Sequence, residues 1–209
     1  MAKQGHLITL EGGEGGGKTT LAVRLRERFK EREQEVVVLR EPGSAAISEQ
    51  IRKVLLSTEN IGMTFTTEVL LFQAARAQTY QEIVLPSLKA GKVVIMDRSR
   101  DSSVVYQGIV RQFGRELIEQ FNDISTKNTY PDLTILLDVS VKTGLQRRKA
   151  SGKFDRLDLE AKEFHHQVRQ AYLQLAKAND HDRWAIIDAE QPLSKVEEQV
   201  WQVIKQRLL

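Results

Sequence analysis

The run Gly12-Gly13-Glu14-Gly15-Gly16-Gly17-Lys18-Thr19 contains the residues needed to hold a chain of phosphates, and it matches the pattern G-x-x-x-x-G-K-[ST] without a substitution. Glycines permit backbone angles that side chains forbid, so their N–H groups can approach an anion closely. A helix that begins here adds unsatisfied N–H groups and the positive end of its dipole. Lys18 would reach the β- and γ-phosphates, and the Thr19 hydroxyl would hold Mg²⁺. The pattern predicts nucleotide binding by residues 12–20; the alternative is a glycine-rich turn without a ligand.

A second pair of chemically active side chains, Asp97 and Arg98, follows the apolar residues 93–96 at the end of a predicted strand. Charges at the carboxyl end of a buried strand are expected where an open parallel sheet binds its ligand. Asp97 has the position of a carboxylate that helps to hold Mg²⁺. The guanidinium of Arg98 suits a transferred or accepted phosphoryl group. A surface ion pair is the alternative.

Phe72 and Arg76 are four residues apart in a predicted helix, so they share one face of it. An aromatic ring beside a guanidinium can stack on a nucleobase and hydrogen-bond its edge. Packing in the core explains Phe72 equally well, and the residues alone leave both interpretations open.

The segment 147–156 is basic and contains a glycine, which favours a mobile lid over about 148–157 that closes on a triphosphate. A solvated loop is the alternative. The chain has no H-R-D-type base, which fits an acceptor that is itself a phosphate. Such an acceptor has a second pKa near ~6 and is already ionised at neutral pH.

Predicted strands and helices alternate from end to end, which implies an α/β fold with a five-stranded parallel sheet and helices on both faces. The predicted strands are 6–11, 36–39, 92–98, 132–138 and 184–188, with 36–39 expected to be buried on both faces. The main predicted helices are 47–56, a long one from about 66, 141–149, 160–179 and 192–208. We find no repeat or linker, so we expect one domain over 1–209.

Composition removes several other classes of function. The 209 residues carry a net charge of +3, which gives no argument for binding nucleic acid or a membrane. There are no cysteines, which excludes disulfides, thiolate catalysis and cysteine-ligated zinc. The four histidines form no spaced cluster, so the sequence gives no case for a histidine metal site. No signal peptide and no apolar run of membrane-spanning length is recognisable, so a cytoplasmic location is expected by default.

Several motifs of this chain occur together in one kinase family. They are residues 11–20, 40–43, 67–78, 97–98, 101–103, 106–108, 131–134, 155–156 and 187–189. On these motifs, which follow the family's order over nearly the full length, the chain resembles the bacterial thymidylate kinases. The resemblance implies a P-loop NTPase fold. It also implies ATP-dependent phosphorylation of dTMP to dTDP in dTTP biosynthesis, with Mg²⁺ and by a homodimer.

The resemblance also implies roles for individual residues around the acceptor. Phe72 would stack on thymine, Arg76 would bond the edge of the base, and Ser103 and Gln107 would lie near it. Tyr106 would pack against the deoxyribose, and Glu14 would face the 3′-hydroxyl.

For the phosphates, the family pattern places Arg98 on the dTMP phosphate and Asp97 near Mg²⁺, and it includes Arg40 in the substrate site. Gly15 stands where some relatives carry an arginine. A catalytic cation must then come from the lid, where the candidates are Arg148, Lys153 and Arg156.

The chain departs from the family pattern at Ser44, Ala45 and Ser99, and in the stretch 108–111. These departures lie around the acceptor. They leave open a related kinase with a different monophosphate acceptor. A nucleotide-binding protein that transfers no phosphate is a third possibility, against which Lys18 and the basic lid argue.

Overall fold

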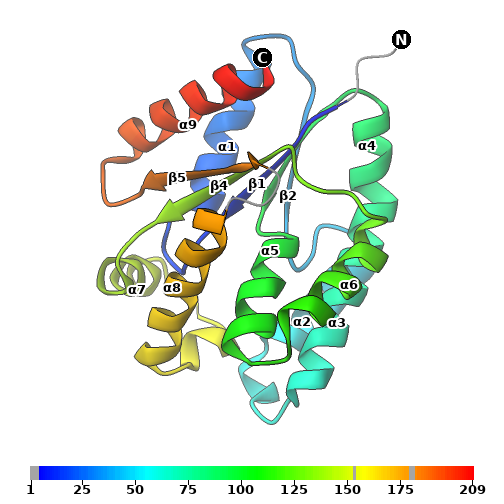
Figure 1. Ribbon diagram of the computed structural model, residues 1–209, viewed down its shortest axis with the longest axis vertical. Helices are drawn as coiled ribbons and strands as arrows, with labels where there is room; N and C mark the ends of the chain where they lie inside the picture. The colour runs from blue at the N-terminus through cyan, green and yellow to red at the C-terminus, as the bar shows by residue number, and fades with distance from the viewer. Residues whose placement is uncertain (1–4, 153, 179–181) are drawn as a thin grey trace.

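A parallel sheet forms the centre of the fold, which is shown in Figure 1. The computed structural model describes residues 5–152, 154–178 and 182–209. Within these residues the five strands are β1 (Leu7–Glu11), β2 (Val36–Arg40), β3 (Val93–Asp97), β4 (Leu133–Asp138) and β5 (Trp184–Asp188). They pair in parallel in the order β2-β3-β1-β4-β5, which confirms the predicted five-stranded sheet.

Helices connect these strands. They are α1 (Lys18–Lys30), α2 (Ala46–Leu56), α3 (Phe65–Thr79), α4 (Leu85–Lys89), α5 (Arg100–Ser103), α6 (Arg115–Thr126), α7 (Val141–Ala150), α8 (Lys162–Ala178) and α9 (Leu193–Leu208). Two wide π-helical turns, η2 (Tyr80–Val84) and η3 (Val104–Val110), continue α3 and α5, and two short 3₁₀ turns are η1 (Thr58–Asn60) and η4 (Arg156–Leu159).

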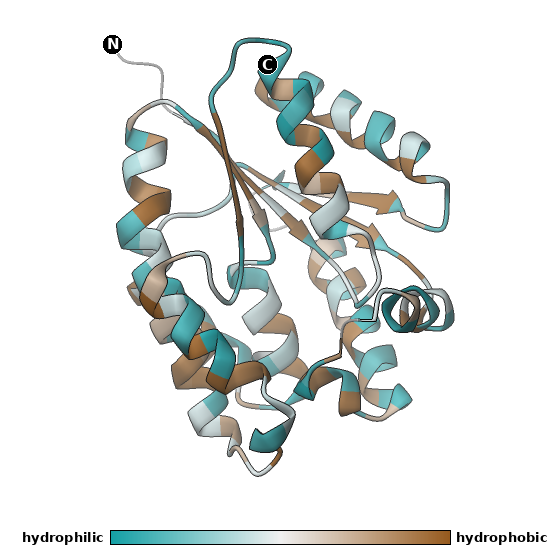
Figure 2. Ribbon diagram, turned by 180° about the vertical axis from the view of Figure 1, so that it is seen from behind, coloured by the Kyte–Doolittle hydropathy of each residue, from teal (hydrophilic) through white to brown (hydrophobic). Residues whose placement is uncertain are grey.

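The helices lie on both faces of the sheet because the strands alternate their apolar side chains between the two faces. In β1, Ile8 and Leu10 pack in a cluster with α1 and α9, whereas Leu7 packs in a cluster with η2. A third cluster joins β4 and β5 to α8, η3 and α6. Figure 2 shows the apolar strands between helices whose outer faces are hydrophilic.

The prediction that the strand over 36–39 is buried on both faces is wrong. β2 is an edge strand, and Val36, Val37 and Val38 are only partly buried. A continuous apolar run identifies a strand of a parallel sheet, but it does not distinguish a central strand from an edge strand.

The long helix predicted from about residue 66 begins at Phe65, after Thr64 accepts a hydrogen bond from the N–H of Thr67. The helical segment continues beyond α3 through η2 into α4, which contains Pro86. Pro86 lies in the first turn of α4, directly after η2, where its missing N–H is tolerated. Among the described helices, none combines the length and apolar character needed to cross a membrane.

The sheet also determines where the site forms. β1 and β3 are neighbours with Leu10 opposite Asp97, so the glycine-rich loop after β1 and the Asp97-Arg98 pair after β3 meet at one edge. This is the edge at which open parallel sheets bind their ligands.

Candidate active site

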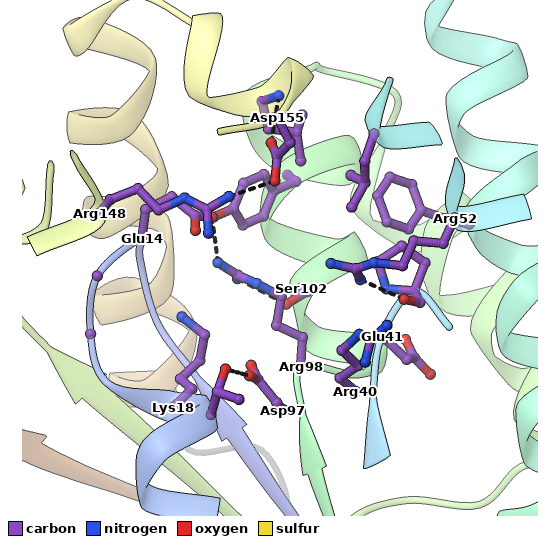
Figure 3. A pocket seen from close by; sticks show the side chains of 18 of the residues that line it. Glu14, Lys18, Arg40, Glu41, Arg52, Asp97, Arg98, Ser102, Arg148 and Asp155 are labelled. Carbon is purple, nitrogen blue, oxygen red and sulfur yellow. Dashed lines mark hydrogen bonds and ion pairs between the residues drawn. The ribbon is translucent and has the colours of Figure 1, made fainter. Parts of the chain in front are cut away.

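A cavity of about 650 Å³ opens at the carboxyl ends of the strands, as Figure 3 shows. Most of the residues singled out from the sequence line it. They are Glu14, Gly15, Gly16, Gly17, Lys18, Thr19, Thr20, Arg40, Phe72, Arg76, Asp97, Arg98, Ser103, Tyr106, Gln107 and Arg148. Gly12, Gly13 and Arg156 are not among the described residues that line it, and Lys153 lies outside the described residues.

The glycine-rich loop needs glycine at particular positions. Gly12 has a φ of +133°, and a Cβ there would lie 2.5 Å from the carbonyl oxygen of Leu137. Gly15 has a φ of +68°, and its Cβ would lie 2.0 Å from the carbonyl oxygen of Gly144. No side chain fits in either place, so the loop runs close against β4 and α7.

The loop leads into α1 with its first N–H groups unsatisfied. Gly17, the residue before the helix, has a left-handed backbone and offers no side-chain cap. Lys18 Nζ donates to the carbonyl oxygens of Gly12 (3.1 Å) and Gly13 (2.7 Å). Burial and the nearby Arg98 cation lower the pKa of Lys18 to about 8, against the opposing effect of Glu14 and Asp97. The uncapped N–H groups favour an anion at this point, and an anion would offset the close approach of the Lys18 and Arg98 cations.

The Thr19 hydroxyl donates a hydrogen bond to Asp97 Oδ2. The structure thus brings together the two residues predicted to hold Mg²⁺. Hydroxyl and carboxylate oxygens are the hard donors that this ion prefers. Within the described residues no three His, Cys, Asp or Glu side chains cluster as a metal site, so further ligands would come from phosphate oxygens and water.

Arg98 lies at the centre of the cavity wall, between the loop and the lid (Figure 3). It is held in a left-handed backbone conformation with a φ of 68°. Its guanidinium donates to Glu14 Oε1 (2.6 Å), the Gly12 carbonyl oxygen (3.0 Å) and Tyr172 Oη (3.2 Å). Burial raises the pKa of Glu14, but Arg98 and Lys18 outweigh it and the pKa falls to about 2. Arg98 is therefore a charged, ordered group close to the loop.

A buried carboxylate, Glu11, supports the strained turn at Arg98. Glu11 is fully buried and accepts from the Ser99 N–H (2.8 Å), Ser102 Oγ (2.6 Å) and Tyr172 Oη (2.8 Å). Burial, followed by the charge of Asp101, raises the pKa of Glu11 to about 7. The Glu11 carboxylate therefore fixes the turn through these bonds, although burial disfavours its charged form.

Glu11→Gln should change how stability depends on pH. The folded state holds a proton on Glu11 more tightly than the unfolded chain does, so wild-type stability should fall as pH rises from about 4.5 to about 7. The loss attributable to Glu11 is on the order of 3 kcal/mol. The glutamine side chain of the variant does not titrate, so the variant's free energy of unfolding in urea should rise relative to that of the wild type across pH 5–8. The exposed Glu163→Gln is the control, and a variant difference that stays constant with pH would contradict the prediction.

Arg76 is buried, with 1% of its surface exposed, and each of its five N–H donors has a protein acceptor. Nε and Nη2 donate to Glu41 Oε2 (2.9 and 2.6 Å), and Nη2 also donates to the Ser99 carbonyl oxygen (3.0 Å). Nη1 donates to Ser103 Oγ (3.0 Å) and Asn122 Oδ1 (2.7 Å). A bond from Arg76 to the edge of a base requires one of these bonds to be exchanged.

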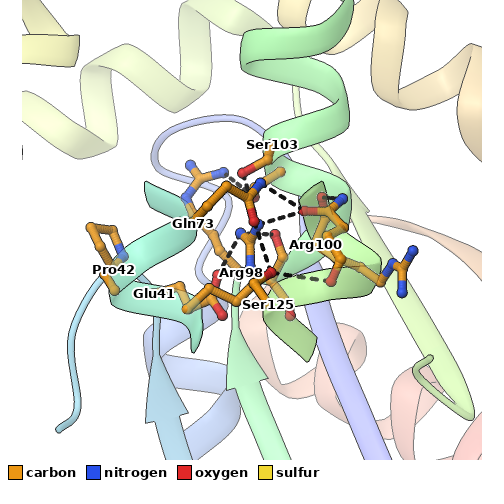
Figure 4. A network of polar contacts seen from close by, with 12 residues as sticks. Glu41, Pro42, Gln73, Arg98, Arg100, Ser103 and Ser125 are labelled. Atoms are coloured by element: carbon orange, nitrogen blue, oxygen red, sulfur yellow. Dashed lines mark hydrogen bonds and ion pairs between the residues drawn. The ribbon is translucent and has the colours of Figure 1, made fainter. Parts of the chain in front are cut away.

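The surrounding network extends beyond these bonds, and Figure 4 labels Glu41, Gln73, Ser103 and Ser125 in it. Gln73 Nε2 also donates to Asn122 Oδ1 (3.0 Å), and Ser125 Oγ donates to Gln73 Oε1 (2.8 Å). Helices α3 and α6 are thereby joined by buried polar contacts behind the cavity.

The described part of the predicted lid is ordered by ion pairs. Arg148, at the end of α7, pairs with Asp155 (2.6 Å) and Asp158 (2.7 Å) and lines the cavity. Arg156 behaves differently. Its guanidinium is buried against Glu68 (2.6 Å) and the Leu55 carbonyl oxygen (2.9 Å), so the structure does not bring this predicted catalytic residue to the cavity.

Two arginines that line the cavity were not among the site residues predicted from the sequence. Arg52 lines the cavity and donates to the Pro42 carbonyl oxygen (2.6 Å), but it lies in a helix without a recognisable motif. Arg147 lines this cavity and an adjoining one of about 440 Å³, bounded by the glycine-rich loop and by residues 189–193. Its place in the basic segment was the signal that could have found it.

The sheet order, and a glycine-rich loop that leads from the central strand into α1 beside Asp97, define a P-loop NTPase. The family model for thymidylate kinase matches residues 10–200. The chain belongs to the thymidylate kinase family.

Individual thymidylate kinases are similar to this chain over nearly its full length. The chain is 48% identical to the thymidylate kinase of Latilactobacillus sakei over 205 residues, which cover 97% of this chain and 95% of the relative. It is 41% identical to that of Bacillus cytotoxicus over 208 residues, covering 99% and 100% of the two chains. The crystal structure of thymidylate kinase from Ehrlichia chaffeensis has a TM-score of 0.78 at 32% identity, with 96% of this chain and 99% of that chain covered.

Proposed function

We propose that this chain transfers the γ-phosphoryl group of ATP to dTMP, which yields ADP and dTDP for the synthesis of dTTP. The observation that carries the proposal is a single cavity with a phosphate-binding loop in one wall and Phe72, Arg76 and Gln107 in another. Arg98 lies between them, where two phosphate groups would meet. Family membership selects thymine as the base.

ATP would bind with its β- and γ-phosphates on the N–H groups of the loop and on Lys18. The adjoining cavity of about 440 Å³ lies on the other side of the loop, and we assign it to the nucleoside part of ATP. Arg147 lines both cavities, so it is placed to contact the part of ATP that passes from one cavity to the other.

The reaction needs alignment and charge neutralisation more than a base. An ionised oxygen of the dTMP phosphate attacks the γ-phosphorus of ATP, and the bond to the β–γ bridging oxygen breaks as ADP leaves. Arg98 would hold the attacking phosphate, and Lys18 and Arg148 would offset the charge on the transferred group. Bound Mg²⁺, held by Thr19 and Asp97, would supply further neutralisation of the phosphates.

At the acceptor, Phe72 would stack on the base, with Arg76, Ser103 and Gln107 at its edge. Tyr106 and Glu14 would lie beside the sugar, and Tyr106 Oη already donates to Glu14 Oε1 (3.2 Å). Arg40 is exposed and paired with Glu49 (2.9 Å), so we assign it to the rim of the site.

Two of the departures from the family pattern, Ser44 and Ser99, make local contacts. Ser44 Oγ accepts from the Arg40 N–H (2.9 Å), and Ser99 Oγ is buried 2.8 Å from Tyr80 Oη. These side chains make contacts within the protein, and nothing in them favours another acceptor.

We include a homodimer in the proposal. Helices α3 and α6 lie side by side, and each carries exposed apolar side chains, among them Leu70 (53% exposed) and Ile124 (70% exposed). Sedimentation velocity should show a dimer that Leu70→Asp or Ile124→Asp weakens, and a wild-type monomer at micromolar concentration would exclude it. A cytoplasmic location is the last part of the proposal, to be tested by cell fractionation.

The decisive test is an assay of nucleoside diphosphate formation with ATP, Mg²⁺ and each of dTMP, dUMP, dCMP, dGMP and thymidine. We expect dTMP to have the highest kcat/KM. A higher value for another acceptor would preserve the kinase class and overturn the choice of substrate. ATP binding without turnover of any acceptor would overturn the enzyme assignment.

A further inference from the structure

Arg156 is not among the described residues that line the cavity, yet it is one of the more deeply buried of the described arginines, with 6% of its surface exposed. It lies at the start of η4, in the described part of the lid. Its Nη2 donates to Glu68 Oε2 (2.6 Å), and its Nε donates to the Leu55 carbonyl oxygen (2.9 Å). The lid segment is thus attached to α3 and to the end of α2 by one guanidinium.

Glu68, the partner of Arg156, is itself 1% exposed and lies in the first turn of α3. Its second oxygen, Oε1, accepts from Gln107 Nε2 (2.8 Å). A carboxylate can only accept, so the nitrogen end of the Gln107 amide must face Glu68. Gln107 also lines the acceptor part of the cavity, which leaves its carbonyl oxygen as the end that a ligand can use.

A second arginine, Arg111, lies beside the Arg156–Glu68 ion pair. Arg111 Nη2 lies 2.6 Å from Glu160 and 3.6 Å from Glu68. Its guanidinium contacts two aromatic rings, 4.6 Å from the centre of Phe65 and 4.8 Å from that of Phe164. The two arginines and two glutamates balance in charge, and the rings limit access of water to them.

We propose that Glu68 is a positioning residue that joins the lid to the acceptor site, because it holds Arg156 of the lid with one oxygen and Gln107 of the acceptor site with the other. Seating of the lid and orientation of the Gln107 amide then depend on the same carboxylate. This inference rests on the proposed function for the identity of the acceptor, dTMP.

The coupling has a reciprocal consequence. If a seated lid increases the affinity for dTMP by some factor, dTMP must stabilise the seated lid by the same factor. Binding of dTMP alone, without ATP, should therefore slow amide hydrogen exchange in residues 154–160. If Glu68 only stabilised the fold, binding of dTMP would leave amide exchange in residues 154–160 unchanged.

Arg156→Gln tests the proposal, because Arg156 contacts Glu68 but is not among the described residues that line the cavity. We expect the Kd for dTMP, measured by titration calorimetry, to rise about tenfold, and exchange in residues 154–160 to become insensitive to dTMP. Glu68→Gln should give both effects, and the double variant should be no worse than Glu68→Gln alone. Arg156→Lys retains the charge and should fall between the wild type and Arg156→Gln. The control is Arg24→Gln, which breaks an arginine–glutamate pair between α1 and α9 and should stay within twofold of the wild type.

Two results would overturn the coupling: a Kd for dTMP within twofold of wild type in Arg156→Gln, or lid exchange in the wild type that dTMP leaves unchanged. If Glu68→Gln lacks a cooperative unfolding transition, the Arg156 variants decide the question. Calorimetry and exchange need no turnover, so a chain that binds dTMP and protects its lid but forms no dTDP would refute the proposed reaction and leave the coupling intact. If the wild type binds a different monophosphate, the same measurements apply to that ligand.

Discussion

Lys18→Ala should lower kcat by about 10²–10³-fold, which corresponds to roughly 3–4 kcal/mol of transition-state stabilisation. Lys18 is the cation at the end of the phosphate loop, and it is buried close to where the γ-phosphate would bind. In such an enclosed site a fixed charge stabilises the transferred group far more than it would in water. The rate of dTDP formation at saturating ATP and dTMP measures the effect.

The alanine variant also removes the donor to the Gly12 and Gly13 carbonyl oxygens, so its thermal unfolding must be compared with that of the wild type. Lys195→Ala, on the exposed side of α9, is the matched control and should retain its activity. A folded Lys18→Ala enzyme with kcat within tenfold of the wild type would mean that the γ-phosphate lies elsewhere.

Arg98→Ala should lower kcat/KM for dTMP by about 10²–10³-fold while changing the KM for ATP little. The guanidinium would bind the acceptor phosphate in the transition state, and it also pairs with Glu14 (2.6 Å). Removing it leaves the Glu14 carboxylate, which is 17% exposed, without its closest cation. Steady-state kinetics with each substrate varied in turn separates the two effects.

Arg98→Gly distinguishes the backbone of this residue from its side chain. At a φ of 68° a glycine relieves strain of about 1–3 kcal/mol, so Arg98→Gly should be more stable than Arg98→Ala and equally inactive. Arg98→Lys should recover part of the activity, because it restores the charge but not the paired donors. If kcat/KM for dTMP in Arg98→Ala stayed within tenfold of wild type, the position assigned to the acceptor phosphate would be wrong.

Much of the fold was predictable because its signals are local. The loop motif occupies eight consecutive residues between a strand and a helix, and the alternation of strands and helices indicates a parallel sheet without any long-range information. Asp97 could be placed near Thr19 because the carboxyl ends of neighbouring parallel strands meet at one edge. Their hydrogen bond confirms that placement.

The direction of a side chain in an irregular segment was not predictable in the same way. Arg156 and Arg148 belong to one basic segment, yet Arg148 faces the cavity and Arg156 faces away. The difference depends on Glu68, which is 88 residues away in sequence. Arg76 shows the same limit: the spacing to Phe72 placed it on the cavity wall, but its bonds to Glu41, Ser99, Ser103 and Asn122 come from three other segments.

The distribution of charge over the chain has a consequence for how fast its substrates arrive. Of the residues that the structure describes, seven cationic and four anionic side chains line the main cavity, a surplus of three positive charges. The whole sequence has the same surplus, with 31 basic and 28 acidic residues, so 24 of each remain in the sequence besides these eleven. The electrostatic field around the protein therefore attracts the anionic nucleotides toward the cavity, and the low-dielectric walls of the cavity focus this field. Association rate constants for ATP and dTMP should fall as ionic strength rises and the Debye length shrinks to about 8 Å.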